Sequence, residues 1–225
     1  VFADTDVEAA VVRGLDNVFE NTGQSCNAPT RMLVERPVYD RAVEIAAAHA
    51  RTVRVGNPAE DGDHIGPLVS QAQFDKVQGL IEIAIREGAR LVAGGPGRPE
   101  GFNRGYYVRP TVFADVTNDM TIAREEVFGP VLAMIPFETE DEAVAIANDT
   151  PYGLSSYIQS GDPERIRRVA RQLRSGMVQV NGTSRAPGSP FGGYKQSGLG
   201  REGGRYGLEE FLEIKVVSGW PADAA

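Results

Sequence analysis

Residues 131–180 read VLAMIPFETE DEAVAIANDT PYGLSSYIQS GDPERIRRVA RQLRSGMVQV, and short apolar runs alternate there with longer amphipathic segments. The apolar runs are typical of buried strands, and the amphipathic segments are typical of helices. Thr139 and Glu142 form a capping box, and Asp162 with Pro163 opens a second helix. Strands interleaved with helices indicate βαβ units and a parallel sheet. The expected elements are Val131–Ile135, Thr139–Ala147, Leu154–Gln159, Asp162–Gly176 and Met177–Val180.

The same alternation extends toward the N-terminus. Thr5 and Glu8 form another capping box, with Glu8 placed to reach back to the Thr5 amide, and a helix follows through Glu20. After Gly182 the pattern gives way to a Gly-rich loop, a short helix over Leu208–Leu212 and a final strand over Glu213–Val217. We predict an α/β fold with a parallel sheet. The other expected elements are strands at Arg31–Glu35, Leu91–Ala93 and Tyr106–Phe113, and helices from Pro37 and from Ser70.

The composition of the 225-residue chain is that of a globular protein, with 41% hydrophobic and 24% charged residues. A net charge of −8 argues against nucleic acid as a partner, because binding phosphates needs a basic face. No apolar run approaches the ~18 residues that span a bilayer, so no membrane segment is expected. One cysteine and two histidines exclude an intrachain disulfide and a Cys/His-rich zinc site. We expect a cytoplasmic protein without a metal site, because a single thiol suits a reducing compartment.

The single cysteine, Cys26, lies just past the end of the first expected helix, in the segment Gly23-Gln24-Ser25-Cys26. Small residues allow a sharp turn there, and a cysteine thiolate is nucleophilic near neutral pH. A lone cysteine is nevertheless more often a small buried apolar residue. The polar neighbours make burial less favourable, and the residue types alone leave both interpretations open.

Three motifs, in order along the chain, resemble those of the aldehyde dehydrogenase superfamily. Asn21–Cys26 (NTGQSC) resembles the nucleophile motif of that family. Glu125–Pro130 (EEVFGP) resembles the motif that holds the nicotinamide ribose, and Ser189–Gly198 (SPFGGYKQSG) resembles the motif near the aldehyde pocket. Three motifs over nearly the whole chain are far more specific than one. The resemblance implies the catalytic domain of the aldehyde dehydrogenase fold, with a C-terminal arm strand.

The resemblance also implies the chemistry. The enzyme would oxidise a small-molecule aldehyde to a carboxylic acid with NAD or NADP. Cys26 would attack the aldehyde carbon to give a thiohemiacetal, and its backbone N–H would donate a hydrogen bond to the alkoxide. Hydride transfer to the nicotinamide would then leave a thioester, which water would hydrolyse.

Cofactor residues follow from the same resemblance. Glu126 would bind the nicotinamide ribose, because a carboxylate can accept hydrogen bonds from both hydroxyls of a diol. Phe128 would pack near the nicotinamide. Gln73 and Lys76 align with positions that approach the cofactor, although both residues also suit an exposed helix face.

The resemblance places two residues in the substrate pocket. Asn27 flanks the nucleophile, where side chains influence the size of the substrate. Phe191 aligns with an aromatic residue that lines the aldehyde tunnel. Asn181, which follows the strand Met177–Val180, is expected to brace the nucleophile loop by hydrogen bonding.

The domain organisation is likewise an implication of the resemblance. Residues 1–197 would form the catalytic domain, and residues 198–225 would form a C-terminal helix and the oligomerisation arm of a homodimer or homotetramer. The general base, a second oxyanion donor and the dinucleotide-binding domain are expected upstream of Val1. We therefore expect this chain alone to lack turnover, and the upstream domain to set the choice between NAD and NADP.

Two alternatives stay open. A CoA-acylating aldehyde dehydrogenase would pass the thioester to coenzyme A instead of water, and a noncatalytic fragment or scaffold would only assemble. A Cys–His hydrolase is less favoured, because His49 falls within a helix and His64 on a loop without a matching third group. Gly198–Gly203 matches the G-x-G-x-x-G pattern, but it follows a loop rather than a strand, and we assign it no phosphate-binding role.

Overall fold

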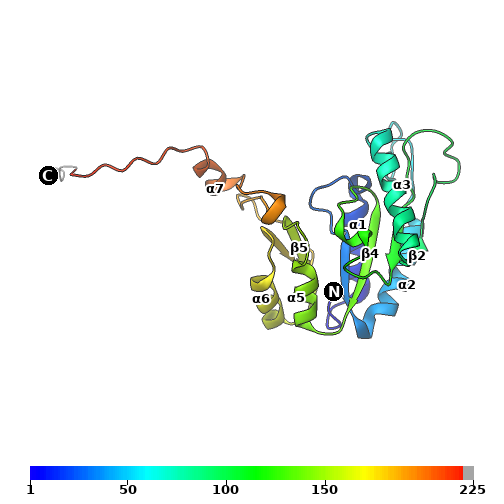
Figure 1. The fold of residues 1–225 in the computed structure, drawn as a ribbon, viewed down its shortest axis with the longest axis horizontal. Coiled ribbons are helices and arrows are strands. Elements are labelled where there is room, and N and C mark those ends of the chain that lie inside the picture. Colours follow the sequence, from blue (N-terminus) through cyan, green and yellow to red (C-terminus); the bar gives the residue numbers. More distant parts are fainter. Residues whose placement is uncertain (220–225) are drawn as a thin grey trace.

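The computed structural model describes residues 1–219, which form helices packed around two β-sheets (Figure 1). The strands are β1 (Arg31–Glu35), β2 (Arg90–Ala93), β3 (Thr111–Ala114), β4 (Val131–Phe137), β5 (Ser155–Ile158) and β6 (Met177–Val180). The helices are α1 (Val7–Phe19), α2 (Arg36–Thr52), α3 (Gln71–Arg86), α4 (Thr121–Arg124), α5 (Glu140–Asn148), α6 (Pro163–Gln172) and α7 (Gly204–Glu209), with 3-10 turns η1 (Glu20–Gly23) and η2 (Lys195–Ser197). None of the described helices combines the length and the apolar character needed to cross a bilayer.

The larger sheet has the strand order β1-β4-β3-β2. β4 runs parallel to both of its neighbours, and only the edge strand β2 is antiparallel, to β3. The second sheet contains β5 and β6, which are parallel. The predicted α/β class with a mostly parallel sheet is therefore confirmed, with one antiparallel edge that the prediction did not include.

The central strand β4 is buried on both faces. Leu132 and Met134 pack with α1 and α2 on one side of the sheet. Val131, Ala133 and Ile135 pack with α3 and α4 on the other side. Successive side chains of a strand point to opposite faces, so a strand covered on both faces is apolar throughout. This burial explains the continuous apolar run in the sequence.

The two sheets are joined by the first residues of the chain. The Glu35 amide, at the end of β1, donates to the Val1 carbonyl at 3.0 Å, and the Phe2 amide donates to the Gln159 carbonyl, just past β5, at 3.0 Å. The Phe2 ring also lies edge-on against Phe137 at 5.4 Å. Residues 1–2 therefore bridge the end of β1 to the end of β5.

Three predicted features near the ends of the chain differ in the structure. The first helix is capped by Asp6, whose carboxylate accepts from the Ala9 amide at 3.1 Å, so the predicted Thr5–Glu8 capping box is wrong. The predicted C-terminal strand over Glu213–Val217 pairs with no other strand among the described residues, and its side chains are exposed. The short helix before it is Gly204–Glu209 rather than Leu208–Leu212. A strand needs a partner edge for its backbone hydrogen bonds, and the sequence pattern alone does not provide one.

Candidate active site

Cys26 lies in a tight turn at the end of α1 and η1. Asn21, Thr22 and Gly23 all have left-handed backbones, with φ of 50°, 58° and 73°. The Ala28 amide then donates to the Ser25 carbonyl at 3.1 Å, so Cys26 is a central residue of the Ser25–Ala28 turn. Its thiol is exposed. The backbone is therefore bent twice to present one cysteine side chain to solvent.

Residues 21–28 contain the expected nucleophile, and we call this segment the nucleophile turn. The segment before α3 braces it from one side. Thr22 Oγ1 donates to the Gly66 carbonyl at 3.1 Å. Gln24 Oε1 accepts from the Val69 amide at 2.8 Å. A β-branched residue with positive φ is strained, and such strain persists only where surrounding contacts hold it. The bond from buried Thr22 supplies one of those contacts.

A second loop, Glu125–Pro130, lies against the nucleophile turn and is held by α3. Gln73 Nε2 donates to the Val127 and Phe128 carbonyls, both at 2.9 Å. Lys76 Nζ donates to the Glu126 carbonyl at 2.6 Å. Phe128 is itself left-handed, with φ of 54°. One face of α3 therefore fixes three consecutive carbonyls of this loop.

The two loops meet at a pair of glycines. A Cβ atom added to Gly23 would lie 2.0 Å from the Gly129 carbonyl oxygen, and one added to Gly129 would lie 2.7 Å from a methyl group of Val77. Side chains at these positions are excluded by sterics. The absence of side chains is what lets the nucleophile turn approach the second loop and α3.

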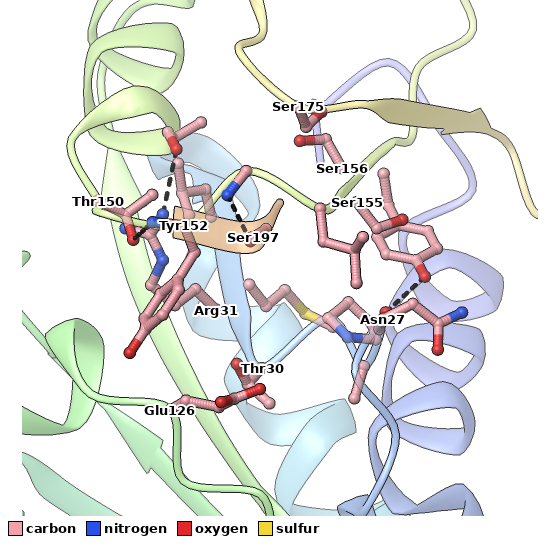
Figure 2. A pocket seen from close by; sticks show the side chains of 18 of the residues that line it. Asn27, Thr30, Arg31, Glu126, Thr150, Tyr152, Ser155, Ser156, Ser175 and Ser197 are labelled. Carbon is pink, nitrogen blue, oxygen red and sulfur yellow. Dashed lines mark hydrogen bonds between the residues drawn. The ribbon is translucent and has the colours of Figure 1, made fainter. Parts of the chain in front are cut away.

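A cavity of about 440 Å³ lies beside this contact. It is lined by Cys26, Asn27, Glu126 and Phe128, together with residues from the facing edges of β1 and β5. Figure 2 shows that many of the surrounding side chains are polar. In residues 1–219, no group of three or more His, Cys, Asp or Glu side chains is placed to hold a metal ion. The labelled polar residues are Asn27, Thr30, Arg31, Glu126, Thr150, Tyr152, Ser155, Ser156, Ser175 and Ser197.

Two cations contact the C-terminal end of α5: Arg31, which lines the cavity, and Lys195, which lies outside the cavity lining. Arg31 donates to the Ala147 carbonyl at 3.1 Å, and Lys195 Nζ donates to the Asn148 and Thr150 carbonyls at 2.7 and 3.0 Å. Burial lowers the pKa of both Arg31 and Lys195. Cations are stabilising at a helix C-terminus, where the carbonyls lack partners within the helix. Their role here is to hold the helix end that borders the cavity.

Comparison with known proteins identifies the family of this chain. The family model described as the aldehyde dehydrogenase family matches residues 1–217. The chain belongs to this family. The family assignment predicted from the three motifs is therefore confirmed.

Solved aldehyde dehydrogenases share the fold of the chain. The enzyme from Bartonella henselae has a TM-score of 0.92 and 58% identity, over 94% of this chain and 44% of that chain. A mutant of aldehyde dehydrogenase C from Pseudomonas syringae, complexed with NAD+ and octanal, has a TM-score of 0.94 and 50% identity, over 98% of this chain and 46% of that chain. The Mycobacterium tuberculosis enzyme, complexed with NAD+, has a TM-score of 0.92 and 44% identity, over 98% of this chain and 46% of that chain. The chain spans about half the length, 46%, of curated relatives that are 50% identical to it.

Three residues that the resemblance to aldehyde dehydrogenases assigned to the site lie outside the cavity lining. Gln73 and Lys76 reach the carbonyls of the second loop, as described above. Phe191 forms a short backbone bridge with Glu202, and the Arg185 guanidinium lies 5.7 Å from the centre of its ring. The structure therefore brings four of the seven predicted site residues together around one cavity.

Asn181 does not brace the nucleophile loop of this aldehyde dehydrogenase chain, and that prediction is wrong. Its amide group donates to the Ser160 carbonyl at 2.9 Å and accepts from the Ser160 amide at 3.0 Å. The register of the two parallel strands pairs Ile158 with Val180, which places the residues after β5 and β6 side by side. Asn181 therefore joins the ends of these strands.

Tyr157, a polar contact of the nucleophile turn, was not among the residues predicted from the sequence. Tyr157 Oη donates to the Asn27 carbonyl at 2.6 Å, across 130 residues of sequence (dashed line at Asn27 in Figure 2). Alternation along β5 places Ser155 and Tyr157 on the same face, which is the only sequence signal that points to this side chain. The alternation does not indicate what that face contacts.

Proposed function

We propose that this protein oxidises aldehydes to carboxylic acids with NAD or NADP, and that Cys26 is the nucleophile. The observation that supports the proposal is the shared cavity, which is lined by the exposed Cys26 together with Glu126 and Phe128. Solved relatives with NAD+ and octanal bound support the cofactor and the substrate class. Family membership supports the reaction type.

The first step forms a bond between Cys26 Sγ and the aldehyde carbon, and the carbonyl electron pair moves to oxygen. The alkoxide needs hydrogen-bond donors where its charge develops. Among the backbone hydrogen bonds of the described residues, the Cys26 amide is not a donor. This N–H is therefore free to donate to the alkoxide, since it sits in the same turn as the thiol.

The second step removes hydride from the thiohemiacetal carbon as the alkoxide re-forms the carbonyl, and Cys26 then carries a thioester. Water cleaves the carbon–sulfur bond, releasing the carboxylic acid and regenerating the thiolate. Of the carboxylates in the described chain, Glu125 and Glu126 alone line the cavity.

The residues of the second loop fit a nicotinamide cofactor. Bound NAD or NADP supplies the hydride acceptor. The Glu126 side chain is exposed on the cavity and makes no hydrogen bond or ion pair within residues 1–219, so both oxygens are free to accept from a ribose diol. Gln73 and Lys76 act on the cofactor site through the loop carbonyls that they hold. Phe128 is half-buried two residues after Glu126, where its ring would pack near a bound nicotinamide.

The proposal extends to the substrate pocket and to assembly. Asn27 lines the cavity next to the nucleophile and limits the size of the aldehyde there. Phe191 is assigned to the outer part of the aldehyde path. The whole protein is a homodimer or homotetramer, supported by the exposed apolar side chains after α7.

The test measures reduced cofactor and product acid when the purified full-length protein receives octanal with NAD+ or NADP+. Cys26→Ala is expected to lower kcat by on the order of 10⁴-fold, because Cys26 is the single thiol among these 225 residues and it would carry the thioester. The variant should keep the thermal midpoint of the parent. Turnover that survives Cys26→Ala contradicts the proposal, and an acyl-CoA product made only with added coenzyme A indicates the acylating branch instead.

A further inference from the structure

The nucleophile turn is held unevenly by its surroundings. On the side of η1, the Thr22 and Gln24 side chains tie it to residues 66–69. Within residues 1–219, the backbone from Ser25 to Pro29 receives a side-chain hydrogen bond only from Tyr157. The far side of the turn therefore depends on one hydroxyl group.

That hydroxyl is well placed to hold the turn. Tyr157 lies in β5, where the parallel register pairs it with Gln179 of β6, so its backbone is fixed by a sheet rather than by a loop. Its Oη donates to the Asn27 carbonyl at 2.6 Å. Burial raises the pKa of Tyr157, and the nearby Cys26 thiol adds to that rise. The phenol consequently stays protonated, and remains a donor, throughout the neutral range.

The peptide that Tyr157 contacts follows the nucleophile directly. Asn27 is the second central residue of the Ser25–Ala28 turn, and the only hydrogen bond inside that turn joins the Ala28 amide to the Ser25 carbonyl. Rotation of the peptide after Asn27 would move this bond and would change the directions of Cys26 Sγ and the Cys26 amide. A misplacement of about 1 Å in such a group can slow a reaction by up to ~100-fold.

We infer that Tyr157 is a positioning residue for Cys26, acting through its hydrogen bond to the Asn27 carbonyl. This inference rests on the proposed function. The bond acts on the geometry of attack rather than on the binding of NAD or aldehyde. Its loss should therefore lower kcat and leave the KM for both substrates nearly unchanged.

The experiment compares Tyr157→Phe with the parent full-length enzyme. The phenylalanine keeps the ring and loses the hydroxyl alone. We expect kcat with octanal to fall about tenfold while both KM values stay within about twofold. Replacing Tyr157 with 4-aminophenylalanine restores an N–H donor at the same place and should recover most of kcat. Tyr107→Phe is the matched control, because Tyr107 packs on Phe102 outside the cavity and its variant should behave as the parent.

Hydrogen exchange provides a readout that does not need turnover. Exchange of residues 24–30 should be faster in Tyr157→Phe than in the parent, and 4-aminophenylalanine should slow it again. If the parent enzyme oxidises no aldehyde, the proposed function fails, while this exchange comparison still decides whether Tyr157 holds the turn. An unchanged kcat in an active Tyr157→Phe enzyme, or unchanged exchange in an inactive one, overturns the inference.

Discussion

At the residue scale, the contact between Gly23 and Gly129 determines how closely the two active-site loops approach. Gly23→Ala introduces two penalties. Its φ of 73° costs an alanine about 1–2 kcal/mol, and the new Cβ lies 2.0 Å from the Gly129 oxygen. We expect the free energy of unfolding to fall by more than about 2 kcal/mol and kcat to fall with it. Chemical denaturation and steady-state kinetics measure both effects.

Gly101→Ala separates the two penalties. Gly101 has a similar φ of 83°, but a Cβ there meets no atom within 4 Å. This control should show the conformational cost without a loss of activity. If Gly23→Ala is no more damaging than Gly101→Ala, the close approach of the loops is not required for function.

At the element scale, α5 and α6 are joined by an ion pair whose strength depends on pH. Arg168 donates to both carboxylate oxygens of Glu140, at 3.0 and 2.9 Å, and Arg165 lies 3.4 Å from the same group. The Arg168 hydrogen bonds lower the pKa of Glu140 below its usual 4.5, and the surrounding arginine charges add to this. A lowered pKa in the folded state means stabilisation that is present above pH 4.5 and lost as pH falls through the folded pKa.

Glu140→Gln removes this stabilisation. The thermal midpoint should fall at neutral pH by an amount that corresponds to no more than about 1 kcal/mol, since Arg168 is 54% exposed and solvent screens the pair. Calorimetry from pH 7 downward should show the gap between variant and parent closing as the pH falls below 4.5 and through the lowered pKa of Glu140. Glu44→Gln, which removes an exposed carboxylate without an ion pair among the described residues, should show no such gap. A constant gap at all pH values would refute the assignment.

Capping residues predicted the start of a helix correctly where a single residue was suited to be the N-cap. The Thr139 cap is present, because Thr139 Oγ1 accepts from the Glu142 amide at 3.2 Å. The Thr5 cap failed because Thr5 and Asp6 are both good N-caps, and pattern alone does not choose between neighbours. The predicted strand over Glu213–Val217 failed for a different reason, since pairing is a tertiary property that five alternating residues do not contain.

For the whole molecule, the resemblance predicted more of the candidate site than residue chemistry did. Cys26 alone was ambiguous, whereas the motifs singled out Cys26, Glu126 and Phe128, which line one cavity in the structure. Asn181 was misassigned, and Tyr157 was missed, because both depend on how β5 and β6 pair. Such contacts depend on three-dimensional packing, whereas a motif records only sequence order.

The described residues after α7 form an extended, apolar segment that does not pack against the core of the molecule (Figure 1). Phe211, Ile214 and Val216 are 88%, 93% and 86% exposed. Apolar groups gathered on an extended segment favour burial against another surface, and an unpaired edge offers backbone groups to a partner strand.

We expect light scattering to give a dimeric or tetrameric mass for the full-length protein, and removal of residues 210–225 to lower that mass. The truncation removes contacts between subunits but no part of the core, because no described residue after Gly207 is buried. The thermal midpoint should therefore fall only by the contribution of the subunit contacts. A monomeric mass for the intact protein, or an unchanged mass after truncation, contradicts this role for the segment.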